Sequence, residues 1–253
     1  MTKEVPFKAN YDRVKAIGKI ANFILYLSCF ISLIVLIITK MKFSSKDLTQ
    51  DFLNSLIACL SVFYFFADII QNYFFQSAEF NRKDDFIDNS FKTKLSEKNS
   101  TGYFSNDNIG DGIIKFGVNC FENSFFTKNI SSKMLVSESI KSTVVFGLFI
   151  LIASLGEKEL FITLLQIALP LSIIQQTIKL LILNLRVKKV FSNFKQIFSS
   201  VHKAKRNSLI IDNVLNYEKT LSWASIQLDS KIFDKLNPQL SIEWERIKSE
   251  HVL

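Results

Sequence analysis

A run of twenty residues without a charged side chain, from Ile20 to Thr39, constrains the fold more than any other feature of this chain. It matches the roughly 20 residues that an α-helix needs to cross the hydrocarbon core of a bilayer. The residues before it are mixed in charge, and it is not followed by the small-residue cleavage site of a secretory signal peptide. We therefore expect this run to remain in the protein as a membrane helix.

Three more apolar runs follow the first. The second covers residues 52–75 and contains a single carboxylate, Asp68, while the fourth covers residues 160–178 without a charge and has Pro170 near its middle. The third, residues 142–155, is short, but its polar flank can extend it toward the headgroups. The loops inside each pair of runs are short, so each pair predicts an antiparallel transmembrane hairpin.

Lysine and arginine residues near the ends of the runs predict the orientation. The formal net charge of +8 fits three partners or settings: nucleic acid, anionic lipid, or the cytoplasmic flanks of membrane helices. Four such residues precede the first run and three follow the fourth, against three and one in the two short loops. This distribution favours membrane flanks and predicts that both termini and the polar middle of the chain are cytoplasmic.

The expected fold is an all-α integral membrane protein with a folded insert between its hairpins. From Glu79 to Lys141 the chain has nine basic and nine acidic residues with regular Phe and Ile insertions, which is typical of a folded surface and not of a disordered tail. The expected segments are a cytosolic N-terminal segment, transmembrane hairpin 1, the cytosolic insert, transmembrane hairpin 2, and a basic amphipathic helix with a helical cytosolic C-terminal region: residues 1–19, 20–75, 76–138, 139–185 and 186–253.

Residues 186–206 hold seven Lys/Arg residues and no acid, with apolar residues three and four apart. This pattern predicts an amphipathic helix that prolongs the fourth run. Its basic side could contact anionic headgroups or a nucleotide phosphate, and its apolar stripe could pair with another subunit. The candidate contacts with lipid or with a nucleotide phosphate are Arg186, Lys188, Lys189, Lys195, Lys203, Lys205 and Arg206. Further on, residues 209–228 have helical spacing, and Asn237 followed by Pro238 predicts a helix start for residues 239–250.

The segment Asp84-Asp85-Phe86-Ile87-Asp88 has two interpretations. Its carboxylates could hold Mg²⁺ that grips a diphosphate. The interpretation that we prefer is ion pairing with the neighbouring basic residues: Arg82, Lys83, Lys92 and Lys94. Neither the histidines nor the cysteines have the spacing of a zinc site or of a nucleophile with its base. We therefore expect no enzyme, no catalytic residue, no metal and no cofactor.

Polar residues inside the runs are candidates for a conducting pathway or its gate. Asp68 could line an aqueous path that favours cations, or it could reach interfacial water or a basic partner about 10 Å from the end of its run. Polar residues of the fourth run could line a pore or bond to other helices, and its proline could be a hinge or a tolerated kink. The candidates are Asp68, Gln166, Pro170, Gln175, Gln176 and Lys179.

Together with this arrangement, the stretches RKDDFIDNSF at residues 82–91 and WASIQLDSKIFDKLNP at residues 223–238 resemble the predicted four-transmembrane (S-4TM type) effectors associated with bacterial nucleotide second-messenger defence systems. The resemblance implies a multi-pass protein of the bacterial inner membrane that disrupts or permeabilises this membrane. It further implies that the protein is silent until a partner synthase makes a cyclic nucleotide during phage infection. The resemblance carries over no catalytic residue, and we expect no DNA partner.

Four spans in one copy are too few to enclose much of a conduit, so a pore would require a homo-oligomer, for which closed symmetry is the common arrangement. In such a pore, a signal read by the cytosolic helices would move the fourth span. The alternative is a membrane-anchored sensor or scaffold that recruits a cytosolic partner without forming a pore. An intact bilayer in cells that make much of the protein would favour that alternative.

Overall fold

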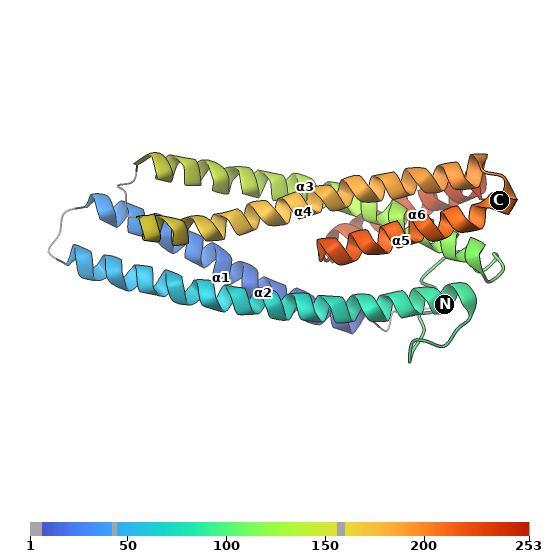
Figure 1. The fold of residues 1–253 in the computed structure, drawn as a ribbon, viewed down its shortest axis with the longest axis horizontal. Helices are drawn as coiled ribbons and strands as arrows, with labels where there is room; N and C mark the ends of the chain where they lie inside the picture. Colours follow the sequence, from blue (N-terminus) through green and yellow to red (C-terminus); the bar gives the residue numbers. More distant parts are fainter. Residues whose placement is uncertain (1–6, 42–44, 156–159, 253) are drawn as a thin grey trace. The chain divides into compact units, whose positions relative to one another are not determined.

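A computed structural model describes residues 7–41, 45–155 and 160–252, without the side chains of residues 36, 40, 148, 149, 151–155 and 160–170. The described residues form α-helices, one short 3₁₀ helix and no β-strand, so the prediction of an all-α chain is confirmed (Figure 1). In order, the helices are α1 (Lys8–Lys40), α2 (Lys46–Phe91), α3 (Ile113–Leu155), α4 (Leu160–Ser200), the 3₁₀ helix η1 (Lys203–Lys205), α5 (Arg206–Ala224) and α6 (Ser230–His251).

The chain divides into two compact units. Unit 1 comprises Met1–Asp12, Phe75–Val136 and Lys179–Leu253, and unit 2 comprises Arg13–Phe74 and Ser137–Ile178. Each of the four long helices contributes residues to both units, because its polar part and its apolar part are helical without interruption. The apolar runs therefore belong mainly to unit 2, and the charged segments belong mainly to unit 1.

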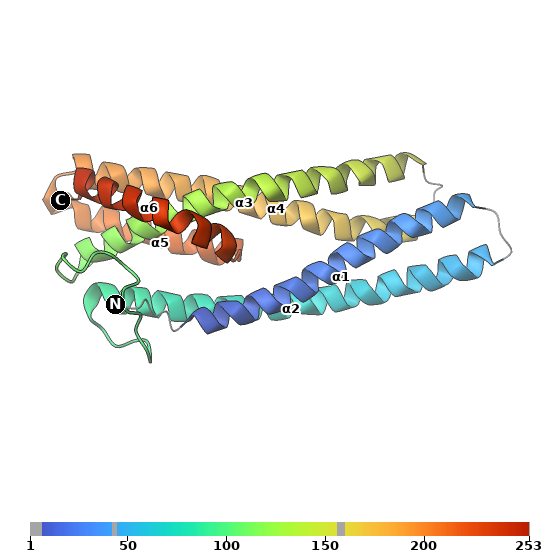
Figure 2. The same cartoon turned by 180° about the vertical axis from the view of Figure 1, so that it is seen from behind.

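Unit 1 has a core in which aromatic side chains predominate. Phe121 on α3 lies at its centre, with ring centroids 5.1 Å from Phe191 and 5.9 Å from Phe198 on α4, and 5.2 Å from Trp244 on α6. Phe121 is 0% exposed and Trp244 is 1% exposed. Figures 1 and 2 both show α3, α4, α5 and α6 side by side in this unit. Aromatic pairs at such distances add to the stabilisation that comes from the burial of their area.

The amphipathic helix predicted for residues 186–206 is the last part of α4. Its apolar stripe is buried in unit 1: Val187, Val190, Phe191, Phe194, Ile197 and Phe198. The stripe packs against helices of the same unit because its spacing of three and four residues places it on one face. Within the chain this stripe is thus covered by its own unit, and its pairing with another subunit stays a prediction.

The prediction of a helix start at Asn237 is wrong. Helix α6 begins at Ser230, because the side chain of Asp229 accepts hydrogen bonds from the backbone N–H groups of Lys231, at 2.8 Å, and Ile232, at 3.0 Å. Pro238 lies inside this helix. A carboxylate at an N-cap satisfies donors that the first turn leaves unpaired, and this cap begins the helix eight residues before Pro238.

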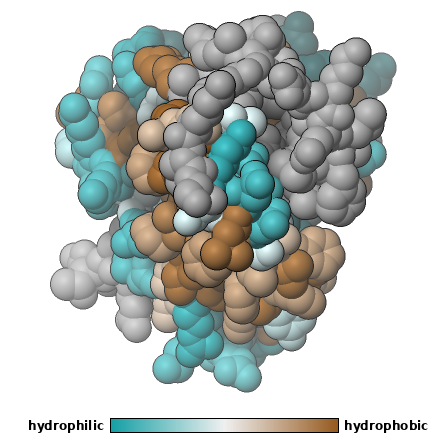
Figure 3. All heavy atoms as spheres, turned by 90° about the vertical axis from the view of Figure 1, so that its left-hand side faces the viewer, coloured by the Kyte–Doolittle hydropathy of each residue, from teal (hydrophilic) through white to brown (hydrophobic). Residues whose placement is uncertain are grey.

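Helices α1 and α2 are long and apolar enough to cross a membrane. In α2, 6% of the most apolar stretch is buried within the chain. In α1, 35% of the corresponding stretch is buried. Large apolar side chains on α2 are instead open to the surroundings: Phe52, Val62, Phe63, Phe65, Phe66, Ile69, Ile70 and Tyr73. Figure 3 shows hydrophobic residues at the surface on the face that it draws, beside hydrophilic ones. This pattern is the reverse of that of a soluble helix, which hides its apolar stripe.

Among the described side chains of unit 2, five buried apolar residues form one cluster: Leu25, Ile31, Val35, Ile57 and Ile173. Ser142 on α3 bonds to Thr177 on α4, so α3 and α4 contact each other within this unit. Most side chains of the third and fourth apolar runs lie outside the described residues, and their role as membrane spans stays a prediction.

Candidate functional site

The carboxylates of the aspartate-rich segment hold the loop that follows α2. Asp85 accepts hydrogen bonds from the backbone N–H and the hydroxyl of Ser100, both at 2.6 Å. Asp88 accepts from the backbone N–H groups of Leu95 and Ser96, both at 2.8 Å, and from the Thr93 hydroxyl at 2.6 Å. Although burial raises the pKa of Asp88, these hydrogen bonds outweigh it and lower the pKa to about 2. Both carboxylates therefore order backbone groups of a loop.

This geometry corrects the preferred interpretation of that segment. Among the described ion pairs, none joins Asp84, Asp85 or Asp88 to a basic residue. Arg82 pairs instead with Glu79 and Glu218. The physical reason is that the loop folds back onto the end of α2, so its N–H and hydroxyl groups occupy the carboxylates of Asp85 and Asp88. In the part of the chain that the structure describes, no group of three His, Cys, Asp or Glu residues is arranged to hold a metal ion.

The same loop forms one wall of a cavity of about 410 Å³ in unit 1. The other walls come from α3, which follows the loop directly in the sequence, and from α6, which lies far from both in the sequence. The described residues that line it are Gly102, Tyr103, Phe104 and Ser105 of the loop, Glu122, Asn123 and Phe126 of α3, and Phe233, Asn237, Ser241, Trp244 and Glu245 of α6. A cavity of this size with aromatic walls and a few polar groups is typical of a small-molecule site.

Glu122 is the buried titratable group of this cavity, with 8% of its surface exposed. Its Oε2 accepts a hydrogen bond from Asn106 Nδ2 at 2.7 Å. Burial raises the pKa of Glu122 to about 7, even though the Asn106 hydrogen bond and the charge of Lys248 act in the opposite direction. Glu122 therefore changes its charge close to neutral pH, which is a property that functional carboxylates often have.

Trp244 lines the cavity with its aromatic ring. Its side chain is 1% exposed, and its Nε1–H has no hydrogen-bond partner among the described residues. Because Nε1 has almost no accessible surface, the indole offers the cavity its ring and not its N–H group.

An ion pair at the rim of the cavity ties the loop to α6. Lys248 Nζ lies 2.7 Å from a carboxylate oxygen of Glu245 and donates to the Ser105 carbonyl at 2.9 Å. The Ser105 hydroxyl donates to Glu245 at 2.6 Å. The first effect on the pKa of Glu245 is a rise from partial burial, but the Lys248 and Ser105 contacts lower the pKa overall. The ammonium group of Lys248 is thus already engaged.

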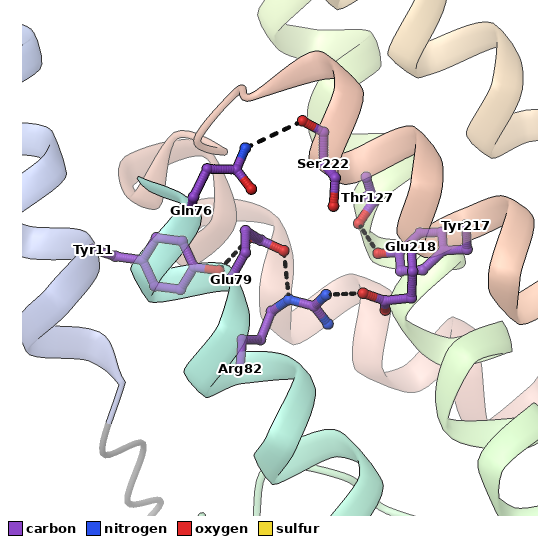
Figure 4. Close-up of polar contacts among 8 residues, drawn as sticks. All are labelled: Tyr11, Gln76, Glu79, Arg82, Thr127, Tyr217, Glu218 and Ser222. Carbon is purple, nitrogen blue, oxygen red and sulfur yellow. Dashed lines mark hydrogen bonds and ion pairs between the residues drawn. The ribbon is translucent and has the colours of Figure 1, made fainter. Parts of the chain in front are cut away.

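A second polar cluster in unit 1 joins the start of α1 and the middle of α2 to α5 (Figure 4). Arg82 donates from Nε to Glu79 at 2.9 Å and from Nη2 to Glu218 on α5, and its side chain is 11% exposed. The hydroxyl of Tyr11 on α1 donates to Glu79. Burial alone would lower the pKa of Arg82, but the two carboxylates outweigh it and raise the pKa well above its usual value. The guanidinium therefore remains charged while it is buried.

Amide side chains extend this cluster. Gln76 on α2 donates to the Ser222 carbonyl at 3.4 Å and to the Ser225 hydroxyl at 3.2 Å, at the end of α5. Gln227 donates to the Tyr11 carbonyl at 3.0 Å. Tyr11, Glu79 and Arg82 all belong to the two helices whose other parts are the apolar runs of unit 2.

The candidate pore residues whose side chains are described lie in unit 2, apart from Lys179. Asp68 is half-buried and accepts a hydrogen bond from Asn72 Nδ2 at 3.1 Å, one turn further along α2. Gln176 is exposed and donates to the Tyr64 hydroxyl at 3.4 Å, which links α4 to α2. Gln175 is exposed and Lys179 is half-buried. The side chains of Gln166 and Pro170 lie outside the described residues.

The candidate basic residues after the fourth run fall into two groups. Arg206 donates to the carbonyls of Phe198 at 2.8 Å and Val201 at 2.9 Å, so it satisfies acceptors near the end of α4. Arg186 lies 5.0 Å from the Trp223 ring centroid, and Lys195 lies 5.9 Å from that of Phe191. The exposed members are Arg186, Lys188, Lys189, Lys203 and Lys205. None of the seven residues lines the cavity described above.

The cavity was not foreseen from the sequence. One local pattern pointed to it: Glu122 is the only charged residue of the stretch Phe116–Thr127, where the apolar side chains recur at helical spacing. A carboxylate among core residues is rare enough to mark a candidate site. The comparisons add no identity, because the chain matches no protein-family model, no curated protein and no solved structure.

Proposed function

We propose that this chain is a membrane effector that oligomerises and, when triggered, permeabilises or depolarises the inner membrane of a bacterium. In this proposal it is a multi-pass protein with both termini in the cytoplasm and acts in anti-phage defence through a nucleotide second messenger. Unit 2 meets the bilayer, and unit 1 is the cytosolic part that receives the trigger.

The observation that carries this proposal is the exposed apolar surface of α2. Only 6% of its most apolar stretch is buried in the chain, and Phe63, Phe65 and Phe66 are each more than half exposed. At about 25 cal/mol per Å², such a surface is costly in water, and a lipid environment or further copies of the chain would remove that cost. A homo-oligomer in a bilayer provides both.

The polar cluster around Arg82 supports a connection from unit 1 to the spans. Tyr11 is at the start of α1, and Arg82 lies on α2 seven residues beyond the apolar run that ends at Phe75. A change in the position of α5 would alter the Glu218 contact of Arg82 and, through Glu79, the contact of Tyr11. Such a network with two arrangements is a means by which a cytosolic signal reaches membrane helices.

A second candidate function is a membrane-anchored sensor or scaffold that recruits a cytosolic partner without a pore. Few polar side chains on the described parts of the apolar runs could line a conduit, and unit 1 carries the cavity and the exposed lysines. In this candidate the spans only localise unit 1. In either case a nucleotide phosphate would be held outside the cavity, whose described lining has no cation, by the candidate basic residues after the fourth run: Arg186, Lys188, Lys189, Lys195, Lys203, Lys205 and Arg206.

Cysteine labelling tests the membrane position first. Cys59 on α2 is exposed in the chain itself, so a soluble protein would react there with a membrane-impermeant maleimide. We expect no labelling of Cys59 in intact spheroplasts or inverted vesicles, and labelling only after detergent is added. Asp47→Cys and Asn108→Cys, both at exposed positions, are the matched controls and should label in spheroplasts and in inverted vesicles, respectively. Labelling of Cys59 in vesicles without detergent would reject the proposed span.

Membrane potential then separates the two functions. The chain is expressed from a tight promoter, with and without a nucleotide-synthesising partner and phage challenge, while a potential-sensitive dye and dye uptake are recorded. Depolarisation that depends on the partner or on phage is the expected result. A polarised, dye-tight membrane under all conditions, with the protein verified in the membrane, would reject the pore and favour the sensor or scaffold.

A further inference from the structure

The cavity between the loop and helices α3 and α6 has the chemistry of a site for an organic cation. Five aromatic side chains line it: Tyr103, Phe104, Phe126, Phe233 and Trp244. Aromatic faces attract cations through their quadrupole, most strongly where water is excluded. Two carboxylates, Glu122 and Glu245, share the cavity with them.

The charges around the cavity disfavour an anion. None of the described residues that line it is a lysine or an arginine. Lys248 lies next to it, but its ammonium group is bound to Glu245 and to the Ser105 carbonyl. Glu245 is accordingly neutralised, and Glu122 is the carboxylate whose charge a cationic ligand would balance. A phosphate in this position would meet Glu122 without a compensating cation.

We propose that this cavity binds a small arylalkylammonium cation. The ammonium group pairs with the Glu122 carboxylate, and the ring lies among the aromatic walls. This assignment uses the buried carboxylate of the cavity and the aromatic side chains that line it. It goes beyond the proposed membrane function and holds whether or not the chain forms a pore.

Binding of such a cation depends on pH in a defined direction. The groups that act on Glu122 are Asn106 and Ser105 of the loop, Lys248 and Glu245 of α6, and Tyr103 opposite. With a pKa of about 7, Glu122 is mostly protonated at pH 6 and mostly ionised at pH 8. Because the cation pairs with the ionised form, its affinity rises by about tenfold across this range.

Isothermal titration calorimetry on the purified full chain in detergent tests the site with tyramine as the probe. Tyramine has a ring, a hydroxyl and an ammonium group that stays charged at pH 6 and pH 8. Two relatives separate its parts: N-acetyltyramine is neutral, and phenethylamine lacks the hydroxyl. We expect N-acetyltyramine to bind at least about tenfold more weakly than tyramine at pH 8, and phenethylamine to bind about as tightly as tyramine, because the recognised groups are the ring and the charge.

The variant Glu122→Gln keeps an oxygen for Asn106 and removes the charge. It should lower the affinity for tyramine at pH 8 by about tenfold and abolish the rise between pH 6 and pH 8. Glu250→Gln, at an exposed carboxylate far along α6 that pairs with Arg246, is the matched control and should bind as the parent does. The pH profile of the unaltered protein tests the proposal independently of how well either variant folds.

Three results would overturn this assignment. The first is no heat of binding for tyramine at millimolar concentration at pH 8. The second is equal binding of tyramine and N-acetyltyramine at that pH, which would mean that the charge is not recognised. The third is a rise in affinity as the pH falls. Because each is measured on purified protein, a failure here leaves the dye and potential measurements on cells unaffected, and a dye-tight membrane leaves the binding result unaffected.

Discussion

The two units of this chain solve opposite problems. Unit 1 buries charged and polar side chains and surrounds them with partners, as at Arg82 and Asp88. The described part of unit 2 leaves large apolar side chains open, as α2 shows. In water, the first arrangement is stable and the second is costly. The proposed function accounts for this difference by placing unit 1 in water and unit 2 in an apolar medium, with the four long helices passing from one to the other.

The largest expected effect comes from breaking the buried ion pairs of unit 1. Arg82→Met removes the cation and leaves Glu79 and Glu218 buried without it, which should lower the free energy of unfolding by about 3–5 kcal/mol. Arg246→Met breaks the exposed pair with Glu250 and should cost less than about 1 kcal/mol. Denaturant unfolding of the full chain in detergent measures both.

Tryptophan fluorescence makes this measurement specific, because Trp223 and Trp244 are the only tryptophans of the chain and both lie in unit 1. Equal losses for Arg82→Met and Arg246→Met would contradict a role for burial. That outcome would remove one half of the contrast between the units.

The next effect concerns the pH dependence of stability. In the folded chain the pKa of Glu122 is about 7, above its ordinary value of 4.5, so the folded state binds the proton more tightly than the unfolded state does. Its contribution to the free energy of unfolding is fully present below pH 4.5 and is lost as the pH rises through 7. The loss is on the order of 3 kcal/mol.

The variant Glu122→Gln cannot titrate, so it isolates this contribution from all other groups. We expect the difference in free energy of unfolding between the parent and the variant to change by that amount between about pH 4 and about pH 8, with the parent losing stability relative to the variant. Parallel curves for the two proteins would show that Glu122 is ordinary and solvated. Fluorescence-detected unfolding over this pH range provides the curves.

Much of the fold follows from periodicity in the sequence, and the site does not. The stripe from Val187 to Phe198 repeats at three and four residues, and this local pattern was enough to predict a buried helical face. The cavity depends on a loop, α3 and α6 meeting in space, and no local pattern specifies that meeting. The start of α6 was missed for another reason: Asp229 and Asn237 are both good N-caps, and packing of α6 decides between them.

The aspartates of residues 84–88 show the same limit of what can be predicted from the sequence. Their identity predicts that they need donors, but lysines and backbone N–H groups both meet that need. Lys92 has a φ of 55°, in the left-handed region, and turns the chain so that the loop passes over Asp88. The sequence contains no glycine there to announce the turn.

Two glycines sharpen the comparison of the units. A Cβ at Gly117 of α3 would lie 2.8 Å from the Ile210 side chain on α5, whereas a Cβ at Gly147 of the same helix, in unit 2, would meet no described atom within 4 Å. Gly117→Ala should therefore destabilise the chain by about 1–3 kcal/mol through overpacking. Gly147→Ala should be neutral or stabilise by up to about 1 kcal/mol, because alanine favours the helix.

Thermal unfolding in detergent, followed by circular dichroism for the whole chain and by fluorescence for unit 1, distinguishes these outcomes. Destabilisation by Gly147→Ala as large as that by Gly117→Ala would mean that another helix lies against Gly147 in the folded protein. The looser packing assigned to unit 2 would then be wrong.

The smallest effect on folding, and the one that most directly tests the surroundings of unit 2, is expected at Phe63. Its side chain is 65% exposed on α2, so Phe63→Ser removes few contacts within the chain and should change the free energy of unfolding in detergent by less than about 0.5 kcal/mol. If this face meets lipid, the same change lowers the fraction of protein recovered in the membrane, since a polar side chain is less favourable there. Ile242→Ser on α6, at a position that is 76% exposed in unit 1, is the matched control and should leave membrane recovery unchanged. Equal recovery of both variants would place the exposed face of α2 in water or against protein and would undo the contrast between the two units.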